Sequence, residues 1–426
     1  MKFPAFRLLA WVWPSLLSLA LTAQNPAPVV TVEHGPNAEV QQGKPYVVLV
    51  SLDGFRYDYL QKYGAKQLLA LGGQGAMATE GMIPSYPSLT FPNHYTLITG
   101  LYPEHHGIVA NKFYDPSRKQ FYATSDATAV RDGSWYGGTP LWVLAEKQGM
   151  RSACFFWPGS EAEIDGGRPT YYLHFDDHFP DEKRIEQVIA WLRLPAAQRP
   201  HLITLYYSNV DHAGHEHGPD SPQTAAAVGH VDQLVGSLRR QLDSLQLPID
   251  LVVVSDHGME HEQGPWIDLS RYADLTNFVT AGWLLYPNSE ADAEKAYQAL
   301  KIKTDAFTVY RRKRVPASLE YNSNPREGDP VIVANGPYAI RAQPPAEDKP
   351  PELGVHGYDP RVMKSMRAIF LAVGPDIRPG SKLEPFENVN VYPLLAKILG
   401  LEAPTVDGRL DVLSKILKNN RDGDTE

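Results

Sequence analysis

The sequence predicts an α/β fold with a doubly wound, mostly parallel sheet that has helices on both faces. Three near-continuous apolar runs have the length and β-branched content of strands buried on both sides, and carboxylate-bearing polar residues follow each run. Amphipathic helical patterns lie between the runs, and this alternation is typical of βαβ crossovers. Ligands of such sheets bind beyond the carboxyl ends of the strands, so we expect the functional site there.

Each element can be placed by its residue pattern. The segments that follow the three strands contain Asp53, Asp211 and Asp256. Apolar residues three or four positions apart predict helices at 181–192 and 228–242. The expected strands are residues 46–52, 201–207 and 249–255, with a fourth at 368–373.

Between residues 268 and 351 the regular alternation of strand and helix patterns stops, which predicts a small α+β subdomain inserted in the main fold. This stretch has a helical pattern at 291–300, strand-like segments at 307–310 and 330–334, and a Pro-rich end. After the last expected helix, at 392–399, the chain becomes polar. The expected parts are an export signal at 1–23, a linker at 24–44, a main domain at 45–412 and a polar tail at 413–426.

The composition is that of a soluble globular protein. Hydrophobic residues make up 43% of the 426 residues and charged residues 21%, which is enough for a packed core. The net charge of -9 argues against binding of a nucleic-acid polymer, which needs a basic face. It does not argue against small anionic substrates, because a metal site can be positive inside an acidic protein. The one cysteine, Cys154, lies in an apolar run and reads as a buried hydrophobe.

The first residues are typical of a cleaved export signal. Lys2 and Arg7 provide positive charge, and the apolar run 8–21, about 14 residues, is shorter than the roughly 20 that a membrane span needs. Thr22-Ala23 offers small residues for cleavage. We therefore expect an exported protein, periplasmic or secreted, without an integral membrane segment after cleavage. An uncleaved anchor is the alternative.

Recurrent acidic and histidine residues after the strands indicate a metal site. One aspartate at a strand end is usually a helix cap, and one histidine in a loop is usually a surface residue. Here three strands are followed by aspartate, and histidine lies near two of them. Carboxylate and imidazole are ligands that zinc prefers, and the set is large enough for two divalent ions. The candidate ligands are Asp53, Asp211, His215, Asp256, His257 and His356.

The nucleophile is a separate question. Thr90 lies in the segment 87–94, and its hydroxyl attacks at neutral pH only if a base or a metal stabilises the alkoxide. Capping of a helix is the ordinary role of such a threonine. Ser85 and Ser88 are neighbouring competitors.

Several motifs together resemble the nucleotide pyrophosphatase/phosphodiesterase family of the alkaline phosphatase superfamily. They occur in family order, and the resemblance extends from about Tyr46 to about Leu401. It implies the alkaline-phosphatase-like variant of the predicted fold. The motifs include Asp53-Gly54-Phe55-Arg56, Thr90-Phe91-Pro92-Asn93-His94-Tyr95, Thr99-Gly100-Leu101-Tyr102-Pro103-Glu104, Ser255-Asp256-His257-Gly258-Met259 and His356-Gly357-Tyr358.

The resemblance implies a role for each candidate. Thr90 would be the catalytic nucleophile, and Asn111 would bind a phosphoryl oxygen. Phe91 and Tyr172 would sandwich a nucleotide base. Two zinc ions per chain would be held, the first by Asp53, Thr90, Asp256 and His257, and the second by Asp211, His215 and His356.

The implied activity is hydrolysis of nucleotide phosphodiester and phosphoanhydride bonds. A phosphothreonine-type intermediate would form, and a nucleoside 5′-monophosphate would be released from small nucleotides such as ATP or dinucleotides. No obligate protein partner is inferred. The alternatives are a diesterase for choline phospholipid headgroups, a phosphomonoesterase and, more remotely, an inactive module that binds nucleotide or metal. Transfer to an acceptor other than water also stays open.

Overall fold

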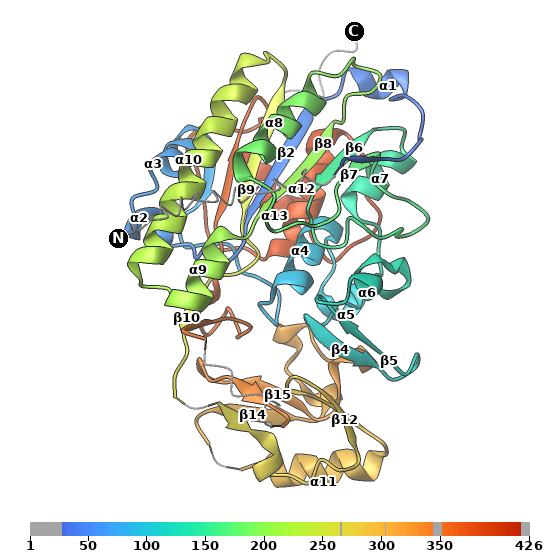
Figure 1. Cartoon of the computed structure of the whole chain (residues 1–426), viewed down its shortest axis with the longest axis vertical. Coiled ribbons are helices and arrows are strands. Elements are labelled where there is room, and N and C mark those ends of the chain that lie inside the picture. The colour runs from blue at the N-terminus through green and yellow to red at the C-terminus, as the bar shows by residue number, and fades with distance from the viewer. Residues whose placement is uncertain (1–27, 265, 303, 344–351, 419–426) are drawn as a thin grey trace, which may run out of the picture.

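The computed structural model describes residues 28–264, 266–302, 304–343 and 352–418 (Figure 1). The signal expected at 1–23 lies outside the described residues, as do residues 419–426 of the expected tail. A large body is built on one sheet, and a smaller lobe lies at one end of it (Figure 1). Among the described residues, none of the helices has the length and apolarity that crossing a bilayer requires.

The body contains a nine-stranded sheet, and the three strands predicted before the acidic residues are neighbours at its centre. β2 (Tyr46–Leu52) pairs in parallel with β8 (Leu202–Tyr207) on one side and β9 (Ile249–Val254) on the other. The predicted fold class is confirmed. The strand order is β1-β7-β6-β8-β2-β9-β18-β3-β19. The other strands of this sheet are β1 (Val30–Thr31), β3 (Ala76–Ala78), β6 (Ser152–Phe155), β7 (Tyr171–Tyr172), β18 (Phe370–Val373) and β19 (Ser381–Leu383).

The fourth predicted strand forms, but it is not parallel to the other three. β18 runs antiparallel to β9, with Phe370 opposite Val254. The chain path explains this direction. After β9 the chain enters the lobe and returns from the same end of the sheet, so the returning strand points the opposite way (Figure 1).

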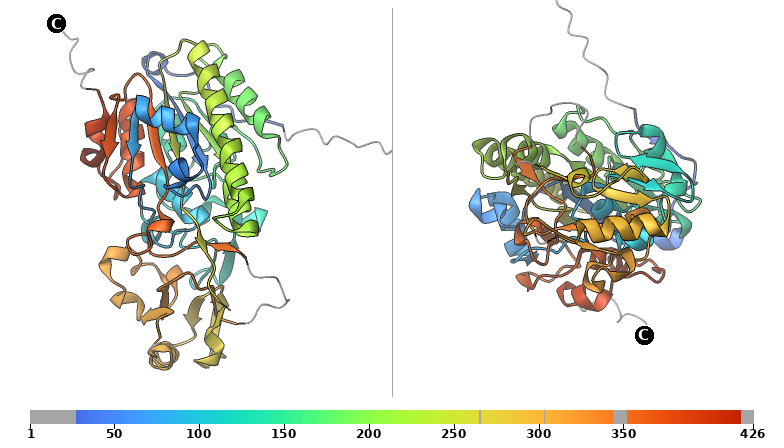
Figure 2. Two further views of the ribbon diagram at one scale, coloured as in Figure 1. Left: turned by 90° about the vertical axis from the view of Figure 1, so that its left-hand side faces the viewer. Right: turned by 90° about the horizontal axis from the view of Figure 1, so that it is seen from below.

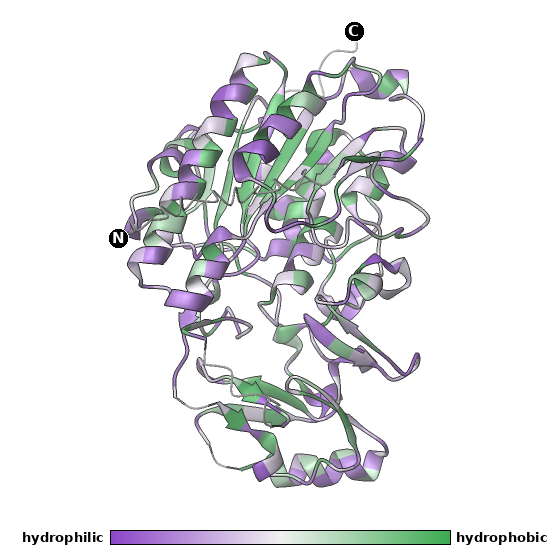
Figure 3. Cartoon of the chain, in the orientation of Figure 1, coloured by the Kyte–Doolittle hydropathy of each residue, from purple (hydrophilic) through white to green (hydrophobic). Residues whose placement is uncertain are grey.

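Helices cover both faces of the sheet (Figure 2). In β2, Val47 and Leu49 belong to one apolar core, and Val48 and Val50 belong to the other. Alternate strand residues point to opposite faces, which is why a strand covered on both sides reads as a continuous apolar run. Figure 3 shows these apolar strands behind helices with polar outer surfaces. One face carries α3 (Lys66–Gln74), α8 (Asp181–Leu192) and α10 (Pro222–Ser244), and the other carries α4 (Thr90–Thr99), α7 (Leu141–Lys147) and α12 (Val391–Leu399).

Within the stretch 268–351, the residues that the structure describes combine helix and strand in the lobe. The lobe has its own apolar core, which includes Leu285, Leu300 and Phe307. α11 (Glu290–Leu300) begins where the Ser289 side chain accepts a hydrogen bond from the Asp292 N–H. The antiparallel pairs are β12 (Phe278–Ala281) with β13 (Leu284–Pro287) and β14 (Phe307–Tyr310) with β15 (Val331–Ala334).

Short elements complete the described chain. Packed structure extends beyond both ends of the main domain expected from the sequence: β1 pairs with β7, and Leu413 and Ile416 are buried. The remaining helices are α1 (Glu39–Gln42), α2 (Tyr59–Lys62), α5 (Pro103–His106), α6 (Ala127–Arg131), α9 (Asn209–His217) and α13 (Leu410–Leu413). The remaining strands are β4 (Lys112–Asp115), β5 (Gln120–Ala123), β10 (Glu260–His261), β11 (Ile267–Asp268), β16 (Ile340–Arg341) and β17 (Gly354–Val355).

Candidate active site

Three aspartates gather at the carboxyl edge of the central strands. Asp53 follows β2 and Asp256 follows β9. Asp211 lies in the first turn of α9, which begins soon after β8. All three side chains are buried. The edge where the sequence predicts the functional site therefore holds carboxylates that are shielded from water.

His257 connects two of these carboxylates. Its Nε2 lies 3.0 Å from Asp256 Oδ2 and 3.5 Å from Asp53 Oδ1. Its Nδ1 lies 2.9 Å from the carbonyl oxygen of Gly258, to which it donates. In the neutral ring this bond directs the Nε2 lone pair toward the carboxylates, where it is available to a cation. Three residues expected at the first metal ion thus lie together.

Asp211, His215 and His356 form a second group. His215 is one helical turn after Asp211 on α9, and its Nε2 lies 3.4 Å from Asp211 Oδ1. His356 follows β17, and its Nε2 lies 3.1 Å from His215 Nε2. The Nδ1 atoms of the two histidines lie 2.8 and 2.9 Å from the carbonyl oxygens of Gly354 and Ser88. If both rings donate from Nδ1, two lone pairs face each other and require a proton or a cation between them.

The two groups form one continuous cluster. The rings of His257 and His356 stack with their centroids 3.6 Å apart and their planes 14° apart. Among the described residues, two sets of three have ligand atoms within 4.8 Å of one another, and both differ from the sets expected from the sequence. They are Asp211 with His257 and His356, and Asp53 with His94 and Asp256.

The carboxylates have unsatisfied acceptor atoms that suit a metal. Asp53 Oδ1, Asp211 Oδ1 and Asp256 Oδ2 are buried and accept no hydrogen bond within the described part of the chain. A buried carboxylate oxygen without a donor is costly. Here three such atoms lie around imidazole nitrogens. This donor set fits divalent cations, zinc among them.

The pKa values reflect the crowding of like charges. Burial raises the pKa of Asp53, and the neighbouring Asp256 raises it further. Burial also opposes ionisation of Asp256, but His257 and His94 outweigh it and hold the pKa of Asp256 well below its usual range. Burial lowers the pKa of His356, and His257 lowers it further. Burial and the neighbouring imidazoles thus favour the neutral form of His356, which is the form that binds a metal.

Thr90 lies beside this cluster at the start of α4. Its hydroxyl oxygen is 3.3 Å from His257 Nε2. The helix begins there because Leu89 is extended and Pro92, in the first turn, has no N–H group to leave unpaired. The N-terminus of a helix favours negative charge, which here means an alkoxide or a phosphoryl group.

The two neighbouring serines have structural partners instead. The Ser88 hydroxyl donates to the carbonyl oxygen of Tyr358 and accepts from the Gly357 N–H, which ties the His356 loop to the Thr90 loop. The Ser85 hydroxyl donates to Asn388 Oδ1. Both serines are buried. Neither is placed to compete with Thr90 as the nucleophile.

Asn111 is held next to the same helix start. Its Oδ1 accepts a hydrogen bond of 3.0 Å from the Phe91 N–H. The bond fixes the orientation of the amide and leaves Nδ2 to donate to another group. Asn111 also lines a cavity that is bounded by His215 and His356. The structure thus places a neutral amide donor at the start of the helix that carries Thr90.

The aromatic residues near the site differ in exposure. Phe91 is half-buried in the first turn of α4. Tyr172 is only 6% exposed, lies in β7 and meets His174 edge to face. Phe175 is 51% exposed, and its ring centroid lies 6.3 Å from that of Tyr206. Phe175 is thus more accessible than Tyr172, and it packs beside the tyrosine that hydrogen-bonds Asp53.

Two supporting residues were not predicted from the sequence. Tyr206 donates to Asp53 Oδ2 at 2.6 Å. His94 lies with Nδ1 2.9 Å from the carbonyl oxygen of Thr90 and 3.4 Å from Asp256 Oδ2. The sequence did contain features that place both near the site: His94 is one helical turn after Thr90, and Tyr206 lies near the end of an expected strand.

The sheet, its covering helices and the cluster at the strand ends define an alkaline-phosphatase-like α/β protein. The family model for type I phosphodiesterase / nucleotide pyrophosphatase matches residues 47–359. The chain belongs to this family, as the motifs had indicated.

Relatives of known name agree with this assignment. Ectonucleotide pyrophosphatase/phosphodiesterase family member 1 of Mus musculus is 35% identical over 402 residues, which are 90% of this chain and 44% of that protein. An uncharacterized pyrophosphatase/phosphodiesterase of Schizosaccharomyces pombe is 35% identical over 398 residues, 88% of this chain and 80% of that protein. The solved structure of murine ectonucleotide pyrophosphatase/phosphodiesterase 5, an inactive form in complex with AMP, is 31% identical with a TM-score of 0.81, covering 88% of this chain and 100% of that one. The chain spans less than half the length of the mammalian family member 1 proteins that it matches.

Proposed function

We propose that this protein is a metal-dependent phosphodiesterase and nucleotide pyrophosphatase that uses Thr90 as its nucleophile. Its substrates are small nucleotides such as ATP or dinucleotides, and its product is a nucleoside 5′-monophosphate. The observation that carries the proposal is the Thr90 hydroxyl, which lies at a helix N-terminus and 3.3 Å from an imidazole of the cluster. Membership of the family supports the same chemistry.

Two zinc ions per chain suit the donor set, because imidazole and carboxylate are typical zinc ligands. When bound, such a pair supplies Lewis acidity that stabilises the attacking and leaving oxygens of an in-line displacement. The residues that would hold the ions are Asp53, Thr90, Asp256 and His257 for the first, and Asp211, His215 and His356 for the second.

The covalent steps follow from the Thr90 hydroxyl. Thr90 Oγ1 loses its proton to solvent and attacks phosphorus, the bond to the leaving oxygen breaks, and the nucleoside phosphoryl group becomes esterified to threonine. Water then attacks the same phosphorus, which releases the nucleoside 5′-monophosphate and restores the hydroxyl. Asn111 Nδ2 would donate to a non-bridging oxygen on which charge develops, since the Phe91 N–H orients its amide.

An aromatic surface would favour nucleotides over simple diesters. Phe91 follows the nucleophile and is half-buried. For the second face of the base we propose Phe175 in place of Tyr172, because Phe175 is 51% exposed and Tyr172 is 6% exposed. Stacking on each ring would contribute roughly 1–3 kcal/mol.

The signal pattern at 1–23 supports an exported location, periplasmic or secreted. The relatives include a protein named as an ectonucleotide pyrophosphatase/phosphodiesterase and one named as a venom phosphodiesterase. Cys154, the one cysteine in the sequence, is buried, so its thiol is shielded from external oxidants.

The function is tested by the rates of the zinc-loaded protein on three nitrophenyl substrates: the ester of thymidine 5′-monophosphate, nitrophenyl phosphate and nitrophenyl phosphorylcholine. We expect kcat/KM to be highest for the nucleotide ester by a factor of ten or more, about the size of one stacking contact. A preference for phosphorylcholine would instead assign a phospholipid diesterase, and a preference for nitrophenyl phosphate a monoesterase. No turnover of any of them would indicate an inactive binding module.

A further inference from the structure

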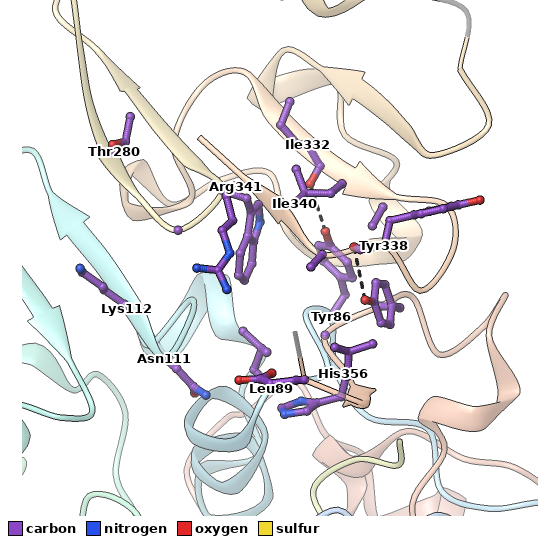
Figure 4. A pocket seen from close by; sticks show the side chains of 18 of the residues that line it. Tyr86, Leu89, Asn111, Lys112, Thr280, Ile332, Tyr338, Ile340, Arg341 and His356 are labelled. Atoms are coloured by element: carbon purple, nitrogen blue, oxygen red, sulfur yellow. Dashed lines mark hydrogen bonds between the residues drawn. The ribbon is translucent and has the colours of Figure 1, made fainter. Parts of the chain in front are cut away.

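A cavity of about 680 Å³ lies between the body and the lobe (Figure 4). Asn111, His215 and His356 line it at the active site. Trp283 and Arg341 line it from the lobe. One continuous space therefore connects the expected position of the phosphoryl group with side chains of the lobe.

A hydrogen bond between two segments of the lobe holds together the side of the cavity that Trp283 and Arg341 line. Ala281 pairs with Leu284, so Gly282 and Trp283 form a two-residue hairpin turn. Gly282 has φ +62°, a conformation that glycine adopts without strain. The Ala342 N–H donates to the Gly282 carbonyl oxygen at 2.8 Å. Because Ala342 follows β16, this bond holds the end of that strand, and with it the neighbouring Arg341, against the tip of the hairpin.

Two cations line the cavity from different parts of the molecule. Lys112 is in β4 of the body, directly after Asn111, and Arg341 is in β16 of the lobe. Both side chains are exposed, and within the described residues neither side chain is part of an ion pair or a hydrogen bond. Burial raises the pKa of Glu262, and the charge of Arg341 opposes this rise. Figure 4 shows the guanidinium of Arg341 directed from the lobe toward Asn111. The acidic residue of the lining, Glu352, lies 3.3 Å from His215 Nδ1.

The geometry of the displacement points the leaving group toward this cavity. In an in-line displacement the leaving oxygen departs on the side of phosphorus opposite the nucleophile. Thr90 lies next to His257, whereas His215, which lines the cavity, is at the far end of the cluster, with His356 between the two. The group released from phosphorus thus faces the cavity. Its volume falls in the range of sites that hold nucleotide-sized ligands.

We propose that this cavity is the leaving-group site, and that Arg341 and Lys112 select leaving groups that carry phosphate charge. These are the pyrophosphate of a nucleoside triphosphate or the nucleotide released from a dinucleoside polyphosphate. A guanidinium matches phosphate oxygens in a forked geometry, and an ammonium group adds a point charge. The proposal rests on the proposed function, and it concerns substrate choice at the same site.

The test compares two substrates that differ in leaving group. ATP releases pyrophosphate, and the nitrophenyl ester of thymidine 5′-monophosphate releases nitrophenolate. We expect Arg341→Gln and Lys112→Gln each to lower kcat/KM for ATP about tenfold, the size of one charge-assisted hydrogen bond. The kcat/KM for the ester should stay within about twofold of wild type. The inhibition constant of pyrophosphate should rise by the same factor by which kcat/KM for ATP falls.

A matched control is Arg271→Gln, which removes an exposed cation of the lobe whose side chain is 78% exposed and outside the cavity lining. Equal losses on ATP and on the ester in Arg341→Gln would mean a structural role and overturn the proposal, as would unchanged ATP turnover in both variants. A wild-type protein that cleaves neither substrate refutes the proposed function, not this site. In that case calorimetry with pyrophosphate decides, because binding should be lost in the Arg341→Gln/Lys112→Gln double variant and kept in Arg271→Gln.

Discussion

The imidazole of His94 lies 3.4 Å from the carboxylate of Asp256, and neither side chain is accessible to solvent. The same ring contacts the carbonyl oxygen of Thr90 through Nδ1 and the hydroxyl of Ser51 through Nε2, at 2.9 and 2.8 Å. Both ring nitrogens therefore have protein partners. This makes His94 a positioning residue that joins the helix of Thr90 to the strand end that carries Asp256.

We expect His94→Gln to weaken zinc binding and to lower kcat by about 10–100-fold, the usual effect of removing a residue that orients a metal ligand. Zinc content after dialysis against graded chelator reports the first quantity, and the nitrophenyl nucleotide ester reports the second. His230→Gln, which changes a histidine on α10, is the control. Unaltered zinc retention in His94→Gln would show that Asp256 does not need this support.

Replacement of Thr90 by alanine should abolish turnover without unfolding the protein. The expected loss in kcat is at least about 10³-fold, since the neighbouring hydroxyls of Ser85 and Ser88 have structural partners and are not placed to attack. Thermal denaturation should give a Tm close to that of wild type, because the Thr90 side chain is only half-buried. Thr90→Ser keeps the hydroxyl and should retain measurable activity. Substantial turnover by pure, zinc-loaded Thr90→Ala would assign the nucleophile elsewhere.

Removal of metal should reduce both activity and stability. Without a cation, Asp53, Asp211 and Asp256 each leave a buried oxygen to which none of the described residues donates a hydrogen bond. A ligand at 100 times its Kd stabilises the native state by about 2.7 kcal/mol, so chelation should lower Tm measurably. Zinc should restore Tm and activity together, whereas magnesium should restore less. A chelated protein with full activity would contradict the metal assignment.

Phe175→Ala should raise KM for nucleotide substrates, with a loss in kcat/KM of roughly 5–150-fold, which corresponds to 1–3 kcal/mol of stacking. Tyr172→Phe should change little, because this ring is buried and the substitution keeps its volume. The matched substrate is methyl nitrophenyl phosphate, which has no base. Its turnover should be the same in all three proteins. The reverse result, with Tyr172→Phe as the damaging change, would restore Tyr172 to the base site.

Glu327 should make the free energy of unfolding depend on pH. The residue is wholly buried in the lobe. Burial raises its pKa to about 8, and Glu104 contributes in the same direction. Because the folded pKa lies above the usual value of 4.5, the native state binds this proton more tightly than the unfolded state.

Stability should therefore fall as pH rises from about 4.5 to about 8, by up to about 1.4 kcal/mol per pH unit. Glu327→Gln should flatten this decline, as measured by urea denaturation at pH 5, 6.5 and 8. Glu163→Gln, at a side chain that is 64% exposed, should leave the slope unchanged. Parallel slopes in wild type and Glu327→Gln would exclude this source of pH dependence.

The sequence was most informative where several consecutive residues are buried, as in the strands at the centre of the sheet. Residues 46–52 are apolar because both faces of β2 are covered, and this pattern alone predicts a central strand. An apolar run does not show which way a strand points in the sheet, so the antiparallel direction of β18 could not be predicted from its residues. That direction depends on where the lobe returns to the sheet.

The candidate metal ligands could be predicted from the sequence, whereas the residues that support them could not. Aspartates that follow parallel neighbouring strands meet at one edge, which brought Asp53, Asp211 and Asp256 together as expected. Exposure of one aromatic residue relative to another depends on packing against distant segments. The local sequence therefore gave no reason to choose Phe175 over Tyr172 as the second residue that stacks on the base. The role of His94 depends on the same packing, since it is set by Asp256 and Ser51.

The pairing of Phe370 with Val254 has an architectural consequence. The polypeptide leaves the sheet at Val254 and rejoins it at Phe370, directly opposite, so the lobe lies outside the path of the central strands. A lobe of another shape could therefore occupy this position without changing the order of those strands. The two ends of the same connection must stay as they are, because they carry Asp256, His257 and His356.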